Sequence, residues 1–180
     1  MSVLRWLRKK SRLPAKFYPS DYWPCVVLLL SEPTFPTPEE VLQTAQASWS
    51  AHAPVEHVGE LKRSASHILC CGGLFFSVHC GGERYNVDGQ ERNEALQRPW
   101  DEHRAWLSVD MPNARNAELY KTKELGGSYK LLLVFVFKSW SQNCVGAYFP
   151  AEGVTILNLG DLAESIRWGR RNGVDLSFLD

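Results

Sequence analysis

The sequence predicts an α+β fold: a two-layer sandwich in which helices pack on one face of a mostly antiparallel sheet. Three stretches indicate this class. Residues 105–111 alternate apolar and polar side chains, residues 25–30 are continuously apolar ahead of a helical pattern, and residues 129–140 repeat their apolar positions at helical spacing. We expect one domain at residues 21–180, after a basic tail at residues 1–20.

The first half of the chain predicts a strand, a helix and then a hairpin. Cys25–Leu30 reads as a strand buried on both faces. Thr37 is the expected N-cap of a helix that runs from Pro38 to about Ser50. We expect the next stretch, 51–64, to be irregular. Strand segments follow at 67–71 and 74–80, with Gly72-Gly73 as a break or bulge between them. Gly81-Gly82 would then form a two-residue hairpin turn before a returning strand at 83–88.

In the second half, residues 91–102 are expected to form a short helix or ordered loop ahead of the strand at 105–111. Ala105, Leu107, Val109 and Met111 share one face of that strand, and Trp106, Ser108 and Asp110 share the other. Residues 144–150 and 153–157 predict two short strands, 161–168 a final helix, and 169–180 a tail.

The apolar run Leu131–Phe137 is ambiguous, because seven such residues suit a buried strand or a helix. The wider window favours a helix, since its apolar positions recur at intervals of three and four residues. These positions are Tyr129, Leu132, Leu133, Val136, Phe137 and Trp140. We expect Leu133 and Phe137 to contact the sheet, and a break or kink at Gly126-Gly127.

Charge is balanced over the whole chain but is unevenly distributed. Six basic residues and no acidic residue fall in positions 1–16, so the remainder carries a net charge of −6. An acidic body argues against nucleic acid as its partner. The basic segment also carries Leu4, Trp6 and Leu7, which would suit an anionic membrane surface; the alternative is a solvated terminus. No apolar run approaches the roughly 20 residues that a membrane span needs.

The five cysteines are odd in number and include an adjacent pair, Cys70-Cys71, which is not the pattern of a disulfide framework. We expect free, mostly buried thiols. Cys70, Cys71 and Cys80, with His67 and His79, are of types that bind zinc, but their spacing matches no standard site. We therefore expect no metal and no cofactor.

Motifs of catalysis and phosphate binding are missing from the sequence. There is no Gly-x-x-x-x-Gly-Lys-Ser/Thr, no Gly-x-Gly-x-x-Gly and no Gly-x-Ser-x-Gly. A trio of Cys80, His103 and Asp110 is conceivable, but no local pattern supports it, and we assign no catalytic residue. The absence of these motifs from the sequence favours a binding function over a catalytic one.

Five residues near the middle strand are the candidate binding residues: Trp100, His103, Arg104, Trp106 and Asp110. An arginine flanked by aromatic rings can hold an anion or stack on a ring. In the alternative interpretation Trp100 is a packing residue, Arg104 pairs with Asp101 or another acid, and Trp106 covers the sheet.

Residues 24–168 resemble the bacterial domain of unknown function 4261. The resemblance rests on a proline-flanked strand leading into a helix, on His103–Asp110, on the buried helix after it and on Gly146–Gly153. It implies a fold and a bacterial cytoplasmic setting, but no mechanism.

Together these observations predict a non-enzymatic protein-interaction domain whose partner is another protein or a second copy of the chain. The alternative is a small-ligand-binding or enzymatic module that uses the His103/Arg104 region.

Overall fold

We describe the fold from a computed structural model of the 180-residue chain. It describes residues 24–49, 53–61, 65–87, 96–112, 125–158, 160–176 and 179. The basic segment 1–16, the expected helix start at Glu91 and the C-terminal Phe178 lie outside these residues.

The described strands form one seven-stranded sheet in the order β2-β3-β4-β5-β1-β6-β7, and every neighbouring pair is antiparallel. The strands are β1 (Cys25–Leu30), β2 (Val55–Leu61), β3 (Ala65–Cys71), β4 (Leu74–Gly81), β5 (Ala105–Asp110), β6 (Cys144–Phe149) and β7 (Val154–Leu157). β1 lies inside the sheet between β5 and β6, and all its residues after Cys25 are buried, as its continuous apolar sequence predicts.

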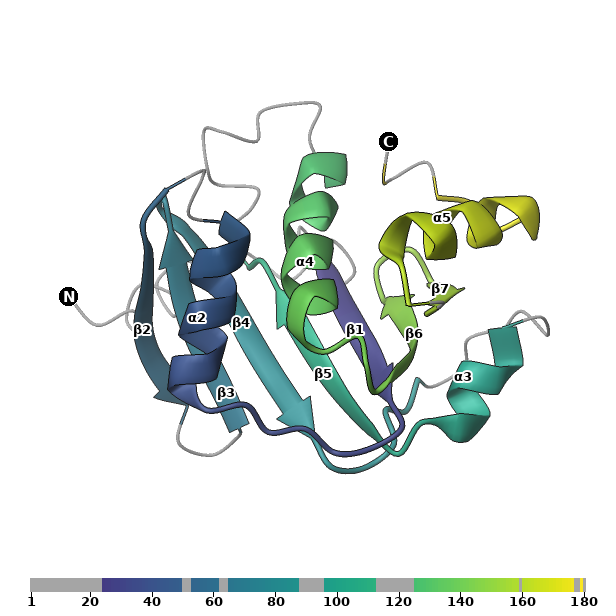
Figure 1. Ribbon diagram of the computed structural model, residues 1–180, viewed down its shortest axis with the longest axis horizontal. Coiled ribbons are helices and arrows are strands. Elements are labelled where there is room, and N and C mark those ends of the chain that lie inside the picture. Colours follow the sequence, from purple (N-terminus) through teal and green to yellow (C-terminus); the bar gives the residue numbers. More distant parts are fainter. Residues whose placement is uncertain are drawn as a thin grey trace, which may run out of the picture.

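Four helices accompany the sheet in the described part of the chain: α2 (Pro38–Trp49), α3 (Gln97–Glu102), α4 (Leu125–Ser139) and α5 (Leu162–Arg171). Figure 1 shows α2 and α4 side by side in front of the strands, with α5 beside β7 and α3 near the lower end of the sheet. This is the α+β sandwich that the sequence predicts. No described helix combines the length and apolar character that crossing a membrane requires.

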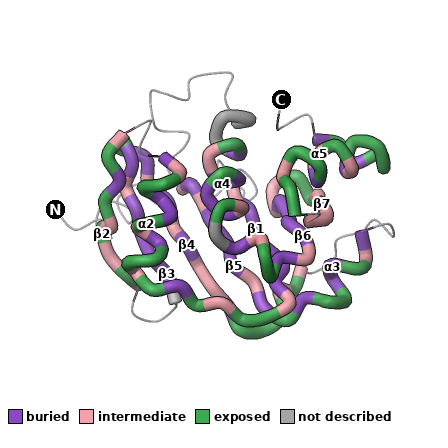
Figure 2. Tube along the Cα trace, in the orientation of Figure 1, coloured by how far each residue is buried: buried purple, intermediate pink, exposed green. Residues whose placement is uncertain are grey.

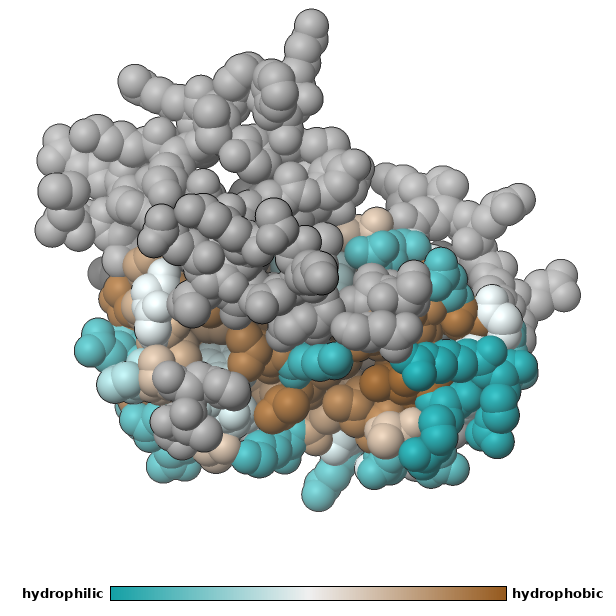
Figure 3. All heavy atoms as spheres, turned by 90° about the horizontal axis from the view of Figure 1, so that it is seen from above, coloured by the Kyte–Doolittle hydropathy of each residue, from teal (hydrophilic) through white to brown (hydrophobic). Residues whose placement is uncertain are grey.

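The main core lies between the sheet and the helices α2 and α4 (Figure 2). Ala105, Leu107, Val109 and Met111 are all fully buried on this side of β5, which confirms the predicted alternation. From above, apolar residues occupy the middle of the described part and hydrophilic residues its rim (Figure 3). Burial of apolar surface in this layer is the main force that stabilises the fold.

The α2 helix begins with a complete capping box. The Thr37 hydroxyl accepts a hydrogen bond from the Glu40 N–H at 3.2 Å, and the Glu40 carboxylate accepts one from the Thr37 N–H at 2.8 Å. Val41, Ala45 and Trp49 then follow at helical spacing and are fully buried. The N-cap predicted for this helix is confirmed.

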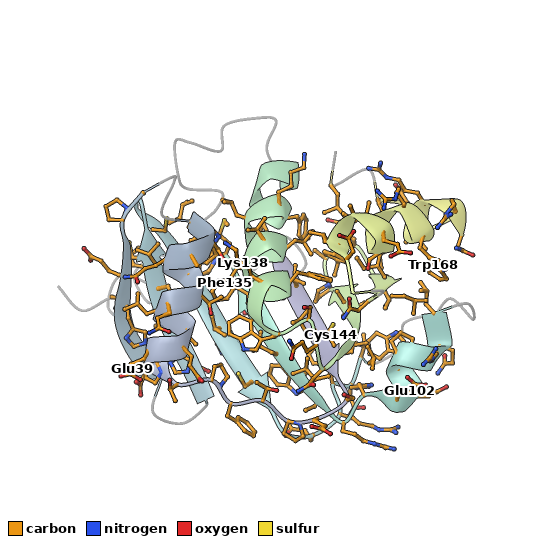
Figure 4. All side chains as sticks on the ribbon, viewed as in Figure 1. Glu39, Glu102, Phe135, Lys138, Cys144 and Trp168 are labelled. Carbon is orange, nitrogen blue, oxygen red and sulfur yellow. The ribbon has the colours of Figure 1, made fainter. Side chains whose placement is uncertain are left out.

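The run Leu131–Phe137 is helical and belongs to α4, as its period predicts. Leu133 is buried, but Phe137 is only partly buried, and Phe135 takes the deeper position. The Phe135 ring, labelled in Figure 4, stacks on Trp49, and their ring centroids lie 4.7 Å apart. The expected break at Gly126-Gly127 is wrong, because both residues lie in the first turn of α4.

The hairpin was predicted one glycine pair too late in the chain. The turn between β3 and β4 is made by Gly72-Gly73, whose φ angles of +56° and +83° are of the kind that two-residue hairpins need. β4 continues through Gly81, and residues 82–87 form no returning strand. The stretch 51–64, expected to be irregular, contains the edge strand β2. A register shift at Val58 interrupts its apolar alternation, which explains why the pattern is weak.

The opposite face of the sheet carries a second, smaller cluster. Val27, Leu29, Trp100 and Tyr148 are buried there, with Tyr85 and Trp106 partly buried against them. Trp100 comes from α3, so this short helix serves the face that α2 and α4 leave open.

Candidate functional site

The five predicted binding residues do not converge on one site. Trp100, His103 and Trp106 belong to an aromatic region at one end of β5, whereas Asp110 lies at the other end of that strand. Arg104 is exposed, and no ion pair joins it to Asp101, although both residues are described. The pairing of Arg104 with Asp101 that the alternative interpretation expects is therefore not seen, and an anion site at Arg104 stays a prediction.

His103 is a buried cross-link, with both ring nitrogens engaged. Its Nε2 accepts a hydrogen bond from the Tyr85 N–H at 3.1 Å, so Nδ1 carries the proton and donates to the carbonyls of Pro99 and Trp100. Burial lowers the pKa of His103, and the nearby Arg84 charge acts in the same direction. A neutral imidazole with no unused nitrogen suits a structural role.

Trp100 also acts through packing. Its indole N–H donates to the Thr155 hydroxyl at 3.2 Å, and its ring meets Tyr148 edge-on at 5.1 Å. Trp100 thereby ties α3 to β6 and β7. This is the alternative interpretation of Trp100 from the sequence.

An aromatic corner forms where β4 ends, made of Phe35, Gly81, Gly82, Tyr85 and Trp106. A Cβ at Gly81 would lie only 2.3 Å from the Trp106 Nε1, so the indole lies directly on a bare backbone. A Cβ at Gly82 would lie 3.2 Å from the Phe35 ring, and the Tyr85 and Trp106 rings meet edge-on at 5.5 Å. The glycine pair that was predicted to turn the chain instead makes room for rings.

Phe35 is the most exposed aromatic residue of this corner, with 57% of its surface accessible. It lies in the segment between β1 and α2, with Pro33 and Pro36 on either side. The Pro36 carbonyl accepts a hydrogen bond from the His67 ring at 3.1 Å, which anchors the segment to β3. An anchored, proline-flanked segment thus presents an aromatic ring to solvent.

A line of polar side chains crosses the same sheet face near the other end of β5. The Ser66 hydroxyl lies 2.7 Å from His79 Nδ1, and His79 Nε2 lies 3.3 Å from the Asp110 carboxylate. These are the residue types of a serine-hydrolase triad. However, Ser66 is only 2% exposed and lies within β3 rather than at the sharp turn of a nucleophile elbow. The line joins β3, β4 and β5 rather than presenting a nucleophile.

Burial holds four of the five thiols in their protonated form. Burial raises the pKa of Cys80 and of Cys144 to about 12, and raises that of Cys71. Burial also raises the pKa of Cys25, with the Asp110 carboxylate beside it adding to the effect. Since the thiolate is the nucleophile, these cysteines are poor catalysts. All five are free, as expected from the sequence.

Sequence reasoning found Trp106 but missed Phe35 and Tyr85. A signal for Phe35 was present, because a large apolar residue between two prolines cannot belong to a helix or to an inner strand. Its contact with Gly82 could not be predicted, since it joins segments 47 residues apart.

No family model, curated protein or solved structure matched the chain. Membership of the domain of unknown function 4261 family thus stays a prediction.

Proposed function

We propose that this chain is a non-enzymatic protein-interaction domain whose contact surface is the aromatic corner. The observation that carries the proposal is the 57% exposure of Phe35 on a segment fixed by Pro33, Pro36 and the His67 hydrogen bond. Single exposed apolar residues are common on protein surfaces. Phe35 differs because Gly82 lies against its ring and Gly81, the next residue, lies against the indole of Trp106.

A fixed aromatic anchor suits protein recognition. Aromatic side chains dominate the binding energy of many interfaces, and an anchor held in place loses little conformational entropy on binding. Trp106 and Tyr85 are partly exposed, and the adjacent residues Gly81 and Gly82 connect the Trp106 indole to the Phe35 ring along the chain.

The charges around Phe35 indicate the kind of partner. Three exposed carboxylates lie near it in the sequence or near Gly82. Glu32 and Glu39 are within four residues of Phe35, and Glu83 directly follows Gly82. Figure 4 shows Glu39 at the lower end of α2. Opposite charges attract a partner to such a surface and select against wrong ones. We therefore expect another protein whose contact segment carries an apolar side chain flanked by lysine or arginine.

The chemistry of the described residues favours binding over catalysis. His103 has no unused nitrogen, Ser66 is buried, and four thiols have raised pKa values. The alternative of a ligand or enzyme site at His103/Arg104 is less well supported, because His103 is buried and both its ring nitrogens are hydrogen-bonded within the fold. Five free thiols fit a reducing compartment, which supports a cytoplasmic location, while a bacterial origin rests on the family resemblance alone.

The proposal is tested by replacing Phe35 in the full chain and recovering its bound proteins from the native cells. Phe35→Ser should remove a partner that the unchanged protein retains, because the anchor is lost. Glu32→Lys and Glu83→Lys should weaken retention by reversing the attraction. Circular dichroism should show that all three variants fold, since these side chains are exposed.

Val134→Ser is the matched control, because Val134 is an exposed apolar residue on α4, with 43% accessibility. Partner retention should survive this change. Equal retention by Phe35→Ser and the unchanged chain would refute the aromatic corner as the contact surface. A concentration-dependent dimer that Phe35→Ser abolishes would instead identify the partner as a second copy.

A further inference from the structure

A second cluster of reactive groups lies on the helix-covered face, at the edge formed by β2 and β3. It contains His57, Glu60 and His67, whose ligand atoms all lie within 4.8 Å of one another. Of these three residues, only His67 was named from the sequence, as one of several residues of types that bind zinc. The cluster is on the opposite face from His79 and Asp110.

A bulge in β2 creates this cluster. In a regular strand, residues three apart point to opposite faces. Here His57 pairs with Leu69 and Gly59 with Ile68, so one extra residue, Val58, is inserted and the alternation shifts. Glu60 then pairs with His67, and both His57 and Glu60 share the face of His67 and Leu69. Bulges often re-aim side chains at functional sites.

The two histidines leave buried nitrogen atoms without partners. Among the described residues, His67 Nδ1 and His57 Nε2 are both inaccessible to solvent and make no hydrogen bond. His67 is only 7% exposed, and the two ring centroids lie 5.7 Å apart. A buried polar atom without a partner has lost its hydrogen bonds to water, so such atoms usually have a ligand, an ion or a water beside them.

The tautomer of His67 leaves its unpartnered nitrogen with a lone pair that can bind a metal. Its Nε2 lies 3.1 Å from the Pro36 carbonyl, which only accepts, so the proton is on Nε2 and Nδ1 presents a lone pair. A carbonyl that holds the far nitrogen in this way is the usual outer partner of a metal-bound histidine. The His67 ring is therefore already oriented for coordination.

We infer that His57, Glu60 and His67 bind a divalent transition-metal ion of the zinc class. Two imidazoles and one carboxylate are a ligand set that zinc takes in proteins, with water in the fourth position. Ligands around such an ion are about 3.4 Å apart, given metal–ligand distances of about 2.0–2.1 Å. Rotation of the exposed Glu60 and the half-buried His57 closes the remaining gap. Glu60 also supplies the negative charge that a cation needs.

The test is calorimetric titration of Zn²⁺ into the full chain after treatment with a chelator. One ion should bind per chain, and the melting temperature should rise with metal concentration. His57→Ala and Glu60→Gln should each weaken binding at least about tenfold, since loss of even an outer partner costs about 10–100-fold. His67→Ala should abolish Zn²⁺ binding. Because His67 is buried, this variant can also disturb folding, so the test depends on the first two variants.

Two matched controls separate this site from other groups. His79→Ala removes a histidine from the opposite face, and Glu56→Gln removes an exposed carboxylate from the same strand. Neither should change the affinity.

Co²⁺ should bind without a sulfur charge-transfer band, which excludes the cysteines as ligands. If no ion binds with one-to-one stoichiometry, the metal site is refuted and water is left as the bridge between the two imidazoles. An unchanged affinity for Zn²⁺ in His57→Ala would also refute the site. Phe35→Ser should bind Zn²⁺ normally, so this test and that of the interaction surface fail independently.

Discussion

At residue 81, one absent methyl group determines how the aromatic corner packs. Three atoms of the Trp106 indole lie 2.3–2.8 Å from the position of a Cβ at Gly81, well inside contact distance. Gly81→Ala should therefore displace the indole and lower the free energy of unfolding by about 1–3 kcal/mol. Urea denaturation followed by tryptophan fluorescence measures the loss.

Gly59 provides the control for this substitution. A Cβ there would meet no atom within 4 Å, and its φ is not in the left-handed region. Gly59→Ala should change stability by no more than about 0.5 kcal/mol. Equal effects of the two substitutions would show that Trp106 does not lie on Gly81.

His103 should make stability depend on pH. Its pKa is lowered in the folded chain from the ordinary value of 6.5, so the unfolded chain binds the proton more readily. The stabilisation is fully present above about pH 6.5 and decreases as the pH falls toward the folded-state pKa. In urea titrations at pH 7.5, 6.5 and 5.5, His103→Gln should show a smaller decrease than the unchanged protein. Parallel pH profiles would contradict this, because the other histidines contribute equally to both proteins.

Of the individual residues, those that depend on local pattern were predictable. The two faces of β5, the Thr37 cap and the free cysteines follow from spacing, capping chemistry and an odd cysteine count. The candidate site was predictable only in part, because Trp106 lies against Gly81 only once β4 has paired with β5. Such pairing brings together residues whose separation in sequence carries no signal.

At the scale of elements, α4 offers the sharpest comparison. Phe135 is fully buried and stacks on Trp49, whereas its neighbour Val134 is 43% exposed. Phe135→Ala should cost about 3–5 kcal/mol, and Val134→Ala about 0.5 kcal/mol or less. Thermal unfolding of the two variants gives the comparison. Similar losses would mean that α4 is rotated about its axis relative to α2.

Helices were easier to predict than strand pairings. α2 and α4 are recognisable because their apolar positions recur every three to four residues, and α2 also has a capping box. β2 was missed because its bulge disrupts the alternation, and the hairpin was misplaced because Gly72-Gly73 and Gly81-Gly82 both qualify as turns by composition. Only the pairing of β3 with β4 distinguishes them.

At the scale of the whole molecule, the sheet joins the two halves of the chain through β1. The early strand β1 lies between β5 and β6, so strands from both ends of the sequence share one hydrogen-bonded layer and one main core. We expect this arrangement to unfold as a single cooperative unit, as small domains usually do.

Two cysteines on opposite sides of β1 can test this cooperativity. Cys71 lies on β3 and Cys144 on β6, both side chains are buried, and burial raises the pKa of both thiols. Neither should react with a thiol reagent until the structure opens. If the sheet opens only as a whole, both residues should be labelled at the same rate after correction for intrinsic reactivity, and that rate should give the global free energy of unfolding. Mass spectrometry of the labelled peptides measures each rate, and full denaturation should expose five reactive thiols. Much faster labelling of Cys71 than of Cys144 would show that β2, β3 and β4 open separately, and the chain would then comprise two units.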